Sequence, residues 1–207
     1  PQGHLWLTVD ICAENQAEVI DDLKRWLDLY LATGVKAGVL HPGGNQMRRQ
    51  QQSPAAVLDT QTQALGQLCT HLQGTDFTLC LENVPGTPEV EQLLSIIKAV
   101  DSPRLGICLD TGHLNMAGGD QGHFLRQAGD RLKAMHLADN EGKTDQHMMP
   151  FGRGNVDWSA VIGGLKALRY EGLLNLEIPG ESKAPLPVLL AKLDYLQVLM
   201  RYLVEDA

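Results

Sequence analysis

The sequence predicts an α/β fold organised around a parallel β-sheet. Two observations carry this prediction: short, nearly continuous apolar runs alternate with longer amphipathic stretches, and the alternation repeats six times along the 207 residues. Nearly continuous apolar runs are typical of parallel strands that are buried on both faces. We expect strands at residues 4–11, 35–41, 77–83, 105–110, 131–137 and 173–178.

The stretches between these runs carry signals for the start of helices. Ser53 and Thr87 each precede a proline, and a hydroxyl side chain before a proline suits the first turn of a helix. Asp157 can cap a helix in the same way. The expected helices include 16–32, the two that follow the Ser-Pro and Thr-Pro pairs, 158–170, and a long apolar helix at 186–204 that closes the fold.

Repeated strand–helix units on one parallel sheet predict a (β/α)8 barrel of the TIM-barrel type. Such a barrel has eight units and about 250 residues, whereas this sequence offers six strands in 207 residues. Because the sequence begins almost directly on a strand, we expect the first two βα units to be absent. The sequence then forms one domain, 1–207, that is incomplete at its N-terminal end. A six-stranded sheet would expose its edges unless another subunit of a homo-oligomer or a lost segment covered them.

Composition narrows the class of protein. The formal net charge is −8, and an acidic surface repels phosphate backbones, which argues against a nucleic-acid partner. The sequence contains no apolar run of 18 residues and no signal-peptide pattern, so we expect a cytoplasmic protein with no membrane partner. The four cysteines form no CxxC pair and predict reduced, buried thiols.

Polar side chains interrupt the predicted strands at their carboxyl ends. Glu82, Asp110, His136 and Glu177 occupy such positions, and His41 ends a fifth strand. In a (β/α) barrel these strand ends share one face, where active sites lie. Several carboxylates on one rim would repel one another without a cation, and burying them unpaired is costly. A divalent metal ion would resolve this conflict.

A second polar cluster follows His136. Asp145 and His147 lie two residues apart, and they indicate either a metal-binding arm or a hydrogen-bonded pair within a loop. Arg153 follows in a glycine-rich segment, where it either clamps a phosphate or carboxylate or stays solvated. His71 and His123 fall in helix or loop stretches, and we assign them no role.

These residues resemble the xylose-isomerase-like TIM barrels, a superfamily that includes sugar isomerases, sugar epimerases and endonuclease IV. The resemblance covers nearly the whole sequence, and the combination of LEN with LDTGH is fairly specific to the superfamily. The matching segments are LCLENVPG, GICLDTGHLNMAG, AMHLADNEGKTDQH, PFGRGNVDW and LEIPGE, with a weaker match at HPGG, 41–44.

The isomerase and epimerase pattern implies one divalent ion, Mn, Mg, Co or Zn, held by Glu82, Asp110, His136 and Glu177. It implies that Glu82 and Glu177 also serve as the acid/base pair. The substrate would be a sugar or sugar-like α-hydroxy carbonyl compound, with proton transfer passing through an enediolate. The residues expected to contact substrate are His41, His113, Lys143, Asp145, His147 and Arg153.

Two other interpretations stay open. Epimerases of this superfamily often carry a substrate-binding arginine six residues after the metal histidine, whereas this sequence has Gly142 there, followed by Lys143. The alternative is an endonuclease IV-like zinc phosphodiesterase acting on abasic DNA; a third interpretation is a truncated or non-catalytic barrel. We expect His4, near the start of the sequence, either to be disordered or to support a metal ligand without binding the metal itself. The endonuclease pattern can be placed on His4, His41, Glu82, Asp110, His113, His136, Asp145, His147 and Glu177.

Overall fold

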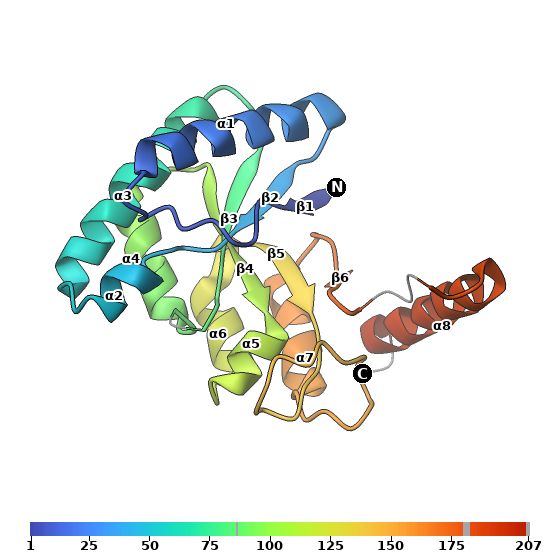
Figure 1. The fold of residues 1–207 in the computed structure, drawn as a ribbon. Helices are drawn as coiled ribbons and strands as arrows, with labels where there is room; N and C mark the ends of the chain where they lie inside the picture. The colour runs from blue at the N-terminus through green and yellow to red at the C-terminus, as the bar shows by residue number, and fades with distance from the viewer. Residues whose placement is uncertain (86, 180–182, 206–207) are drawn as a thin grey trace.

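The computed structural model describes residues 1–85, 87–179 and 183–205. At its centre lies a parallel sheet of six strands, which are neighbours in the order in which they occur along the chain (Figure 1). The sheet curves into a half-barrel that accounts for six of the eight strands of a TIM barrel. The strands are β1 (Gln2–His4), β2 (Ala37–Leu40), β3 (Thr78–Glu82), β4 (Leu105–Asp110), β5 (Leu132–Leu137) and β6 (Asn175–Leu176).

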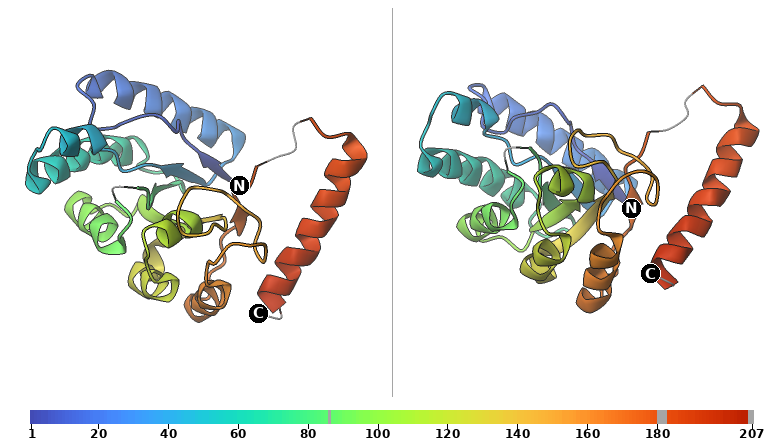
Figure 2. Two further views of the ribbon diagram at one scale, coloured as in Figure 1. Left: turned by 60° about the horizontal axis from the view of Figure 1, so that its bottom comes forward. Right: turned by 90° about the horizontal axis from the view of Figure 1, so that it is seen from below.

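Helices cover the outer, convex side of this sheet (Figure 2). Each crossover between neighbouring strands contains at least one helix, as a parallel sheet requires. The helices are α1 (Gln16–Thr33), α2 (Asn45–Arg49), α3 (Pro54–His71), α4 (Val90–Val100), α5 (Thr111–Met116), α6 (Gln121–Ala128), α7 (Trp158–Leu168) and α8 (Leu186–Glu205), with a 3-10 turn, η1 (Gly129–Arg131).

The strands bury both faces in two separate apolar clusters. The outward-facing residues of the strands pack with the helices in the main core. A small cluster on the inner face contains Val39, Cys80, Cys108 and Ala134, all fully buried. Because side chains alternate along a strand, the residues two positions further on share this inner face. They are His41, Glu82, Asp110 and His136.

Two of the three predicted helix starts are confirmed. Ser53 Oγ accepts a hydrogen bond from Ala56 N at 3.2 Å, and Asp157 caps α7 through Ala160 N. The prediction for Thr87 is wrong, because α4 begins only at Val90. Thr87 instead exchanges two backbone hydrogen bonds with Val84 in an isolated bridge, so its backbone cannot enter a helix.

The predicted strand at 4–11 is also wrong. The strand β1 ends at His4, and a loop follows, although Leu5 and Ile11 are fully buried. The Asp10 carboxylate fixes this loop, because Oδ1 accepts hydrogen bonds from Cys12 N and Gly44 N, both at 2.8 Å. The apolar residues therefore reach the core from a loop, which an apolar run alone does not distinguish from a strand.

The long helix predicted at 186–204 is present as α8, but it closes the fold only in part. It stands beside α7, away from the other helices (Figures 1 and 2), and its buried residues are Leu199 and Leu203. Large apolar side chains that stay exposed on α8 are Leu186, Val188, Leu190, Leu193, Tyr195, Val198, Tyr202 and Val204.

The cysteine prediction is confirmed for burial, since all four thiols are unpaired and buried. None of the helices in the described part of the chain has the length and apolar character needed to cross a membrane.

Candidate metal centre

Four ionisable side chains meet where the strands end. Glu82 and Asp110 are the last residues of β3 and β4, His136 is next to last in β5, and Glu177 follows β6. The strand register places Asp110 beside His136, and Glu177 N donates to the carbonyl of Leu137 at 3.0 Å. One donor atom from each of the four side chains lies within 4.8 Å of the others. The convergence expected from the sequence is therefore present.

This cluster holds polar atoms that lack hydrogen-bond partners. Within the described residues, four buried side-chain atoms lack a partner, and three are Asp110 Oδ2, His136 Nδ1 and Glu177 Oε2. His136 Nδ1 lies 2.9 Å from Glu177 Oε2, but the two groups are not aligned for a hydrogen bond. Leaving such atoms buried and unpaired costs about 1–3 kcal/mol each. A divalent cation accepts these lone pairs together, so the donor set fits a metal.

Electrostatics of the cluster point the same way. Burial opposes the ionisation of Glu82, yet contacts with His113, His136 and His4 hold its pKa well below the usual range. Burial raises the pKa of Asp110 to about 7, and the charge of His113 opposes this rise. Burial lowers the pKa of His136, but its contacts with Cys108, Glu177 and Glu82 raise that pKa overall. The carboxylates thus require nearby positive charge, which either imidazolium groups or a metal ion can supply.

His4 and His41 flank the cluster on the β1–β2 side. His4 Nε2 lies 3.1 Å from Glu82 Oε2, and His41 Nε2 lies 3.5 Å from the same oxygen. His4, Glu82 and His136 form a second group whose donor atoms lie within 4.8 Å of one another. His4 does not fray, because its Nδ1 donates to the Leu5 carbonyl at 2.6 Å and its ring stacks on His136. The expectation that His4 is disordered is therefore wrong, whereas its contact with Glu82 leaves the alternative, a residue that supports a metal ligand, as a prediction.

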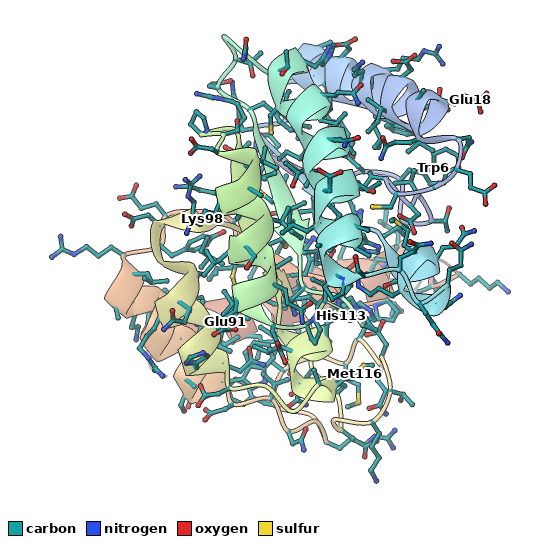
Figure 3. The ribbon with its side chains drawn as sticks, turned by 90° about the vertical axis from the view of Figure 1, so that its left-hand side faces the viewer. Trp6, Glu18, Glu91, Lys98, His113 and Met116 are labelled. Atoms are coloured by element: carbon teal, nitrogen blue, oxygen red, sulfur yellow. The ribbon has the colours of Figure 1, made fainter. Side chains whose placement is uncertain are left out.

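A third donor group lies on the other side of the cluster. Asp145 Oδ2 is 3.3 Å from His113 Nε2, and Asp145 Oδ1 is 3.1 Å from His147 Nε2. His113 Nδ1 also lies 3.3 Å from Glu82 Oε1, so this group adjoins the first. His147 has a φ of 45°, a conformation rare for residues other than glycine and often found at functional sites. His113 lies early in α5, and Met116 lies at its end (Figure 3).

Asn83, which the sequence places in the LEN motif without a role of its own, is a supporting residue. Its side-chain amide forms two hydrogen bonds with the backbone of Asp110 at the end of β4. Asn83 Nδ2 donates to the Asp110 carbonyl, and Asp110 N donates to Asn83 Oδ1. Asp110 Oδ1 then accepts from His113 N at 2.6 Å and caps α5. The available signal was an asparagine directly after a buried strand, where an unsatisfied amide would be costly.

Two of the expected contact residues belong to none of the three donor groups. Lys143 is exposed, and the Arg153 side chain is 73% exposed, 3.6 Å from Glu141. Their roles toward a substrate stay predictions. His71 and His123 pair with Asp28 and Glu91, respectively.

A curved parallel sheet with ionisable side chains gathered at its carboxyl ends defines a protein of the (β/α)-barrel class. A family model described as "Xylose isomerase-like TIM barrel" matches residues 2–199. The chain belongs to this family.

Proteins similar to this chain in sequence include an uncharacterized protein, a probable endonuclease and a sugar epimerase. The chain is 32% identical to the uncharacterized protein MJ1311 of Methanocaldococcus jannaschii over 58% of this chain and 43% of that protein. A probable endonuclease 4 of Mycoplasma pneumoniae is 34% identical over 51% of this chain and 37% of its own length. A D-psicose 3-epimerase of Enterocloster bolteae is 28% identical over 42% and 27%, respectively. The match therefore spans less than half of each of these relatives.

Solved structures support the fold over nearly the whole chain. A D-tagatose 3-epimerase-like protein superimposes with a TM-score of 0.81 at 21% identity, covering 99% of this chain and 78% of that one. A D-psicose 3-epimerase crystallised in the presence of D-fructose gives a TM-score of 0.74 at 14% identity, with 98% and 78% coverage. At such identities the likeness establishes the architecture.

Proposed function

We propose that the chain is a divalent-metal-dependent enzyme that isomerises or epimerises a sugar or sugar-like α-hydroxy carbonyl compound. The observation that carries the proposal is the convergence of Glu82, Asp110, His136 and Glu177 within 4.8 Å, with unpartnered donor atoms on three of them. These four residues would hold one Mn, Mg, Co or Zn ion. When bound, the ion would supply Lewis acidity toward the carbonyl and hydroxyl oxygens of the substrate.

The two glutamates are suited to move the proton. Glu177 has a side chain that is 33% exposed, so substrate can reach it, whereas Glu82 is 1% exposed. Glu177 takes the proton from the carbon next to the carbonyl group, which leaves an enediolate. Either glutamate then returns a proton to carbon. His113 lies 3.3 Å from Glu82 and can donate to a hydroxyl of the bound substrate.

The relatives support this class of reaction without fixing the substrate. Sugar 3-epimerases occur both among the sequence relatives and among the structural neighbours. The position of the frequent epimerase arginine is held here by Gly142, which has a φ of 71° in a turn. An arginine would be strained in that conformation. We therefore assign substrate contact to His41, His113, Asp145, His147, Lys143 and Arg153, and leave the sugar unspecified.

Proton exchange with solvent tests the proposal directly. The metal-loaded protein is incubated with a panel of ketoses and ketose phosphates in D2O, and deuterium at the carbon next to the carbonyl is followed by NMR. We expect incorporation with at least one sugar and its loss in Glu177→Gln. Glu171→Gln, a change at an exposed glutamate, is the control and should leave exchange unchanged. Metal-bound protein that exchanges no proton in any sugar would instead support the non-catalytic interpretation.

A second candidate is phosphodiester hydrolysis at abasic DNA, which a specific observation favours. His4, Glu82 and His136 form one additional donor group, and His113, Asp145 and His147 form another. Two or three metal ions at neighbouring sites would clamp a phosphate. The net charge of −8 counts against DNA as a partner. A zinc-loaded protein that cleaves a duplex with one abasic site, but not the intact duplex, would establish this candidate over the first.

A further inference from the structure

A groove lies between the N-terminal halves of α3 and α4, and none of the metal donors lines it. Its volume is about 590 Å³, within the roughly 300–1,000 Å³ that small-molecule sites occupy. Val57 and Ile96 form an apolar floor, both almost fully buried, and Leu58 adds to it. Polar side chains, including Arg48, also line the groove. The two helices lie side by side in Figure 3.

Arg48 is the one charged residue among the described residues that line this groove. Its Nη1 donates to the Gly43 carbonyl and to Asn45 Oδ1, both at 3.0 Å, and its Nη2 donates to Thr87 Oγ1 at 3.1 Å. A guanidinium has five N–H donors, so Nε–H and one Nη2–H have no acceptor within the described part of the chain. No carboxylate of that part forms an ion pair with Arg48 either.

We propose that this groove binds a small organic carboxylate. The carboxylate would accept from the two remaining N–H groups of Arg48, because its two oxygens match neighbouring guanidinium nitrogens. The hydrocarbon part would cover Val57, Leu58 and Ile96. One positive charge balances one carboxylate, whereas a phosphate monoester carries a second negative charge that no lining residue offsets. The proposed occupant is a free small molecule, because the groove offers one cationic group for an acidic head and a short apolar surface for a hydrocarbon body.

The same groove is connected to the segment that follows His41. Gln61, which lines the groove, donates through Nε2 to the carbonyls of Pro42 and Gly43 at 2.9 and 3.2 Å. Arg48 also holds the Gly43 carbonyl. A bound carboxylate would restrain Arg48 and thereby this segment, so the amide protons of residues 43 and 44 should exchange more slowly with solvent when the groove is filled.

The test is a titration of the full chain with hexanoate, followed by calorimetry and by NMR. Acetate offers the head alone, hexan-1-ol the body alone, and inorganic phosphate the competing anion. We expect hexanoate to bind at least about tenfold more tightly than each of these, as a charge-assisted pair added to apolar contact implies. In Arg48→Met, the affinity for hexanoate should fall at least about tenfold. Arg49→Met is the matched control, because Arg49 is exposed and does not line the groove.

Ala55→Trp keeps the proposal testable if loss of Arg48 disturbs the fold. Ala55 is exposed on the first turn of α3 and lines the groove, so an indole there should block it without altering the core. Weakened hexanoate binding in a variant with an unchanged melting temperature supports the proposal. Equal binding of hexanoate and hexan-1-ol, tighter binding of phosphate, or unchanged affinity in both variants would overturn it.

Discussion

His147 and Glu177 are joined through a hydrogen bond from the His147 ring to the Glu177 carbonyl, with 2.7 Å between Nδ1 and the oxygen. The loop that follows β5 is thereby fixed to the residue that follows β6. Through Asp145, the same loop also reaches His113 on α5. His147, a member of the third donor group, is thus held by the backbone of Glu177, a member of the first group. Changes in the loop should therefore alter the position of Glu177.

We predict that His147→Asn weakens the connection between the third donor group and Glu177. Asparagine tolerates the positive φ of this position, so the substitution removes the ring and spares the backbone. The first metal ion should still bind, while kcat falls by about tenfold, because one hydrogen bond positioning Glu177 is lost. Steady-state kinetics on the identified sugar would measure this. Complete loss of the first ion would show that the loop belongs to the primary site.

Asn83 should matter for stability and for metal affinity together. Asn83→Ala leaves the buried N–H and carbonyl of Asp110 without partners, and we expect the free energy of unfolding in urea to fall by about 2–4 kcal/mol. Metal affinity should fall as well, because Asp110 loses its fixed position. The control Asn15→Ala, at an exposed residue, should change stability by less than about 1 kcal/mol. A variant as stable as the parent would show that Asn83 does not stabilise the fold by holding the Asp110 backbone.

Asp139 anchors the 139–158 loop, and its charge is predicted to be essential. Oδ1 accepts from Asn140 N and Val156 N, while Oδ2 accepts from Trp158 Nε1 at 2.9 Å. Asp139→Asn must turn an NH2 group toward one of these donors, so we expect a loss of about 2–4 kcal/mol in thermal unfolding. The matched change Asp157→Asn should be nearly neutral, because asparagine also caps a helix. Equal effects of the two changes would contradict this role.

The buried thiols should be inert at neutral pH. Burial, reinforced by the charge of Asp10, raises the pKa of Cys12 to about 12. We expect alkylation of the folded chain at pH 8, followed by mass spectrometry, to be at least about a hundredfold slower than that of the unfolded chain.

The same shift in the pKa of Cys12 has a definite sign for stability. Because the pKa is raised in the folded state, the contribution is present below the usual value of 9.0 and is lost as the pH rises toward 12. Cys12→Ala should flatten this alkaline decline. An identical decline in the variant would show that other groups cause the loss of stability at alkaline pH.

The sequence was sufficient for the half-barrel and for the meeting of four donors, since strand ends in a parallel sheet share one edge. It failed where side chains override local pattern. Residues 5–11 are mostly apolar but form no strand, because Asp10 ties the loop to Gly44. Thr87 enters a bridge with Val84 in place of a helix. Gly44 lies 34 residues from Asp10, too far to be inferred from spacing. The Val84–Thr87 bridge is local, but its backbone pairing overrides the helix-start signal of the Thr-Pro pair.

The donor groups illustrate the same limit. Asp145 and His147 lie two residues apart in sequence, but whether they reach His113 depends on the course of a long loop. Asn83 escaped notice because its partner, Asp110, lies 27 residues away. Lys143 and Arg153 were singled out for their charge, and the structure leaves both in exposed segments.

The most direct test is the number of metal ions that the chain binds. Purified chain is stripped with chelator and titrated with Mn²⁺, and bound ion is measured by EPR and elemental analysis in the parent and in Asp110→Asn. Asp59→Asn, an exposed change, serves as control. We predict one ion bound tightly per chain, with an affinity that falls at least about a hundredfold in Asp110→Asn and is unchanged in the control. Two or three tight ions that depend on His41 or His147, or one ion indifferent to Asp110→Asn, would contradict it.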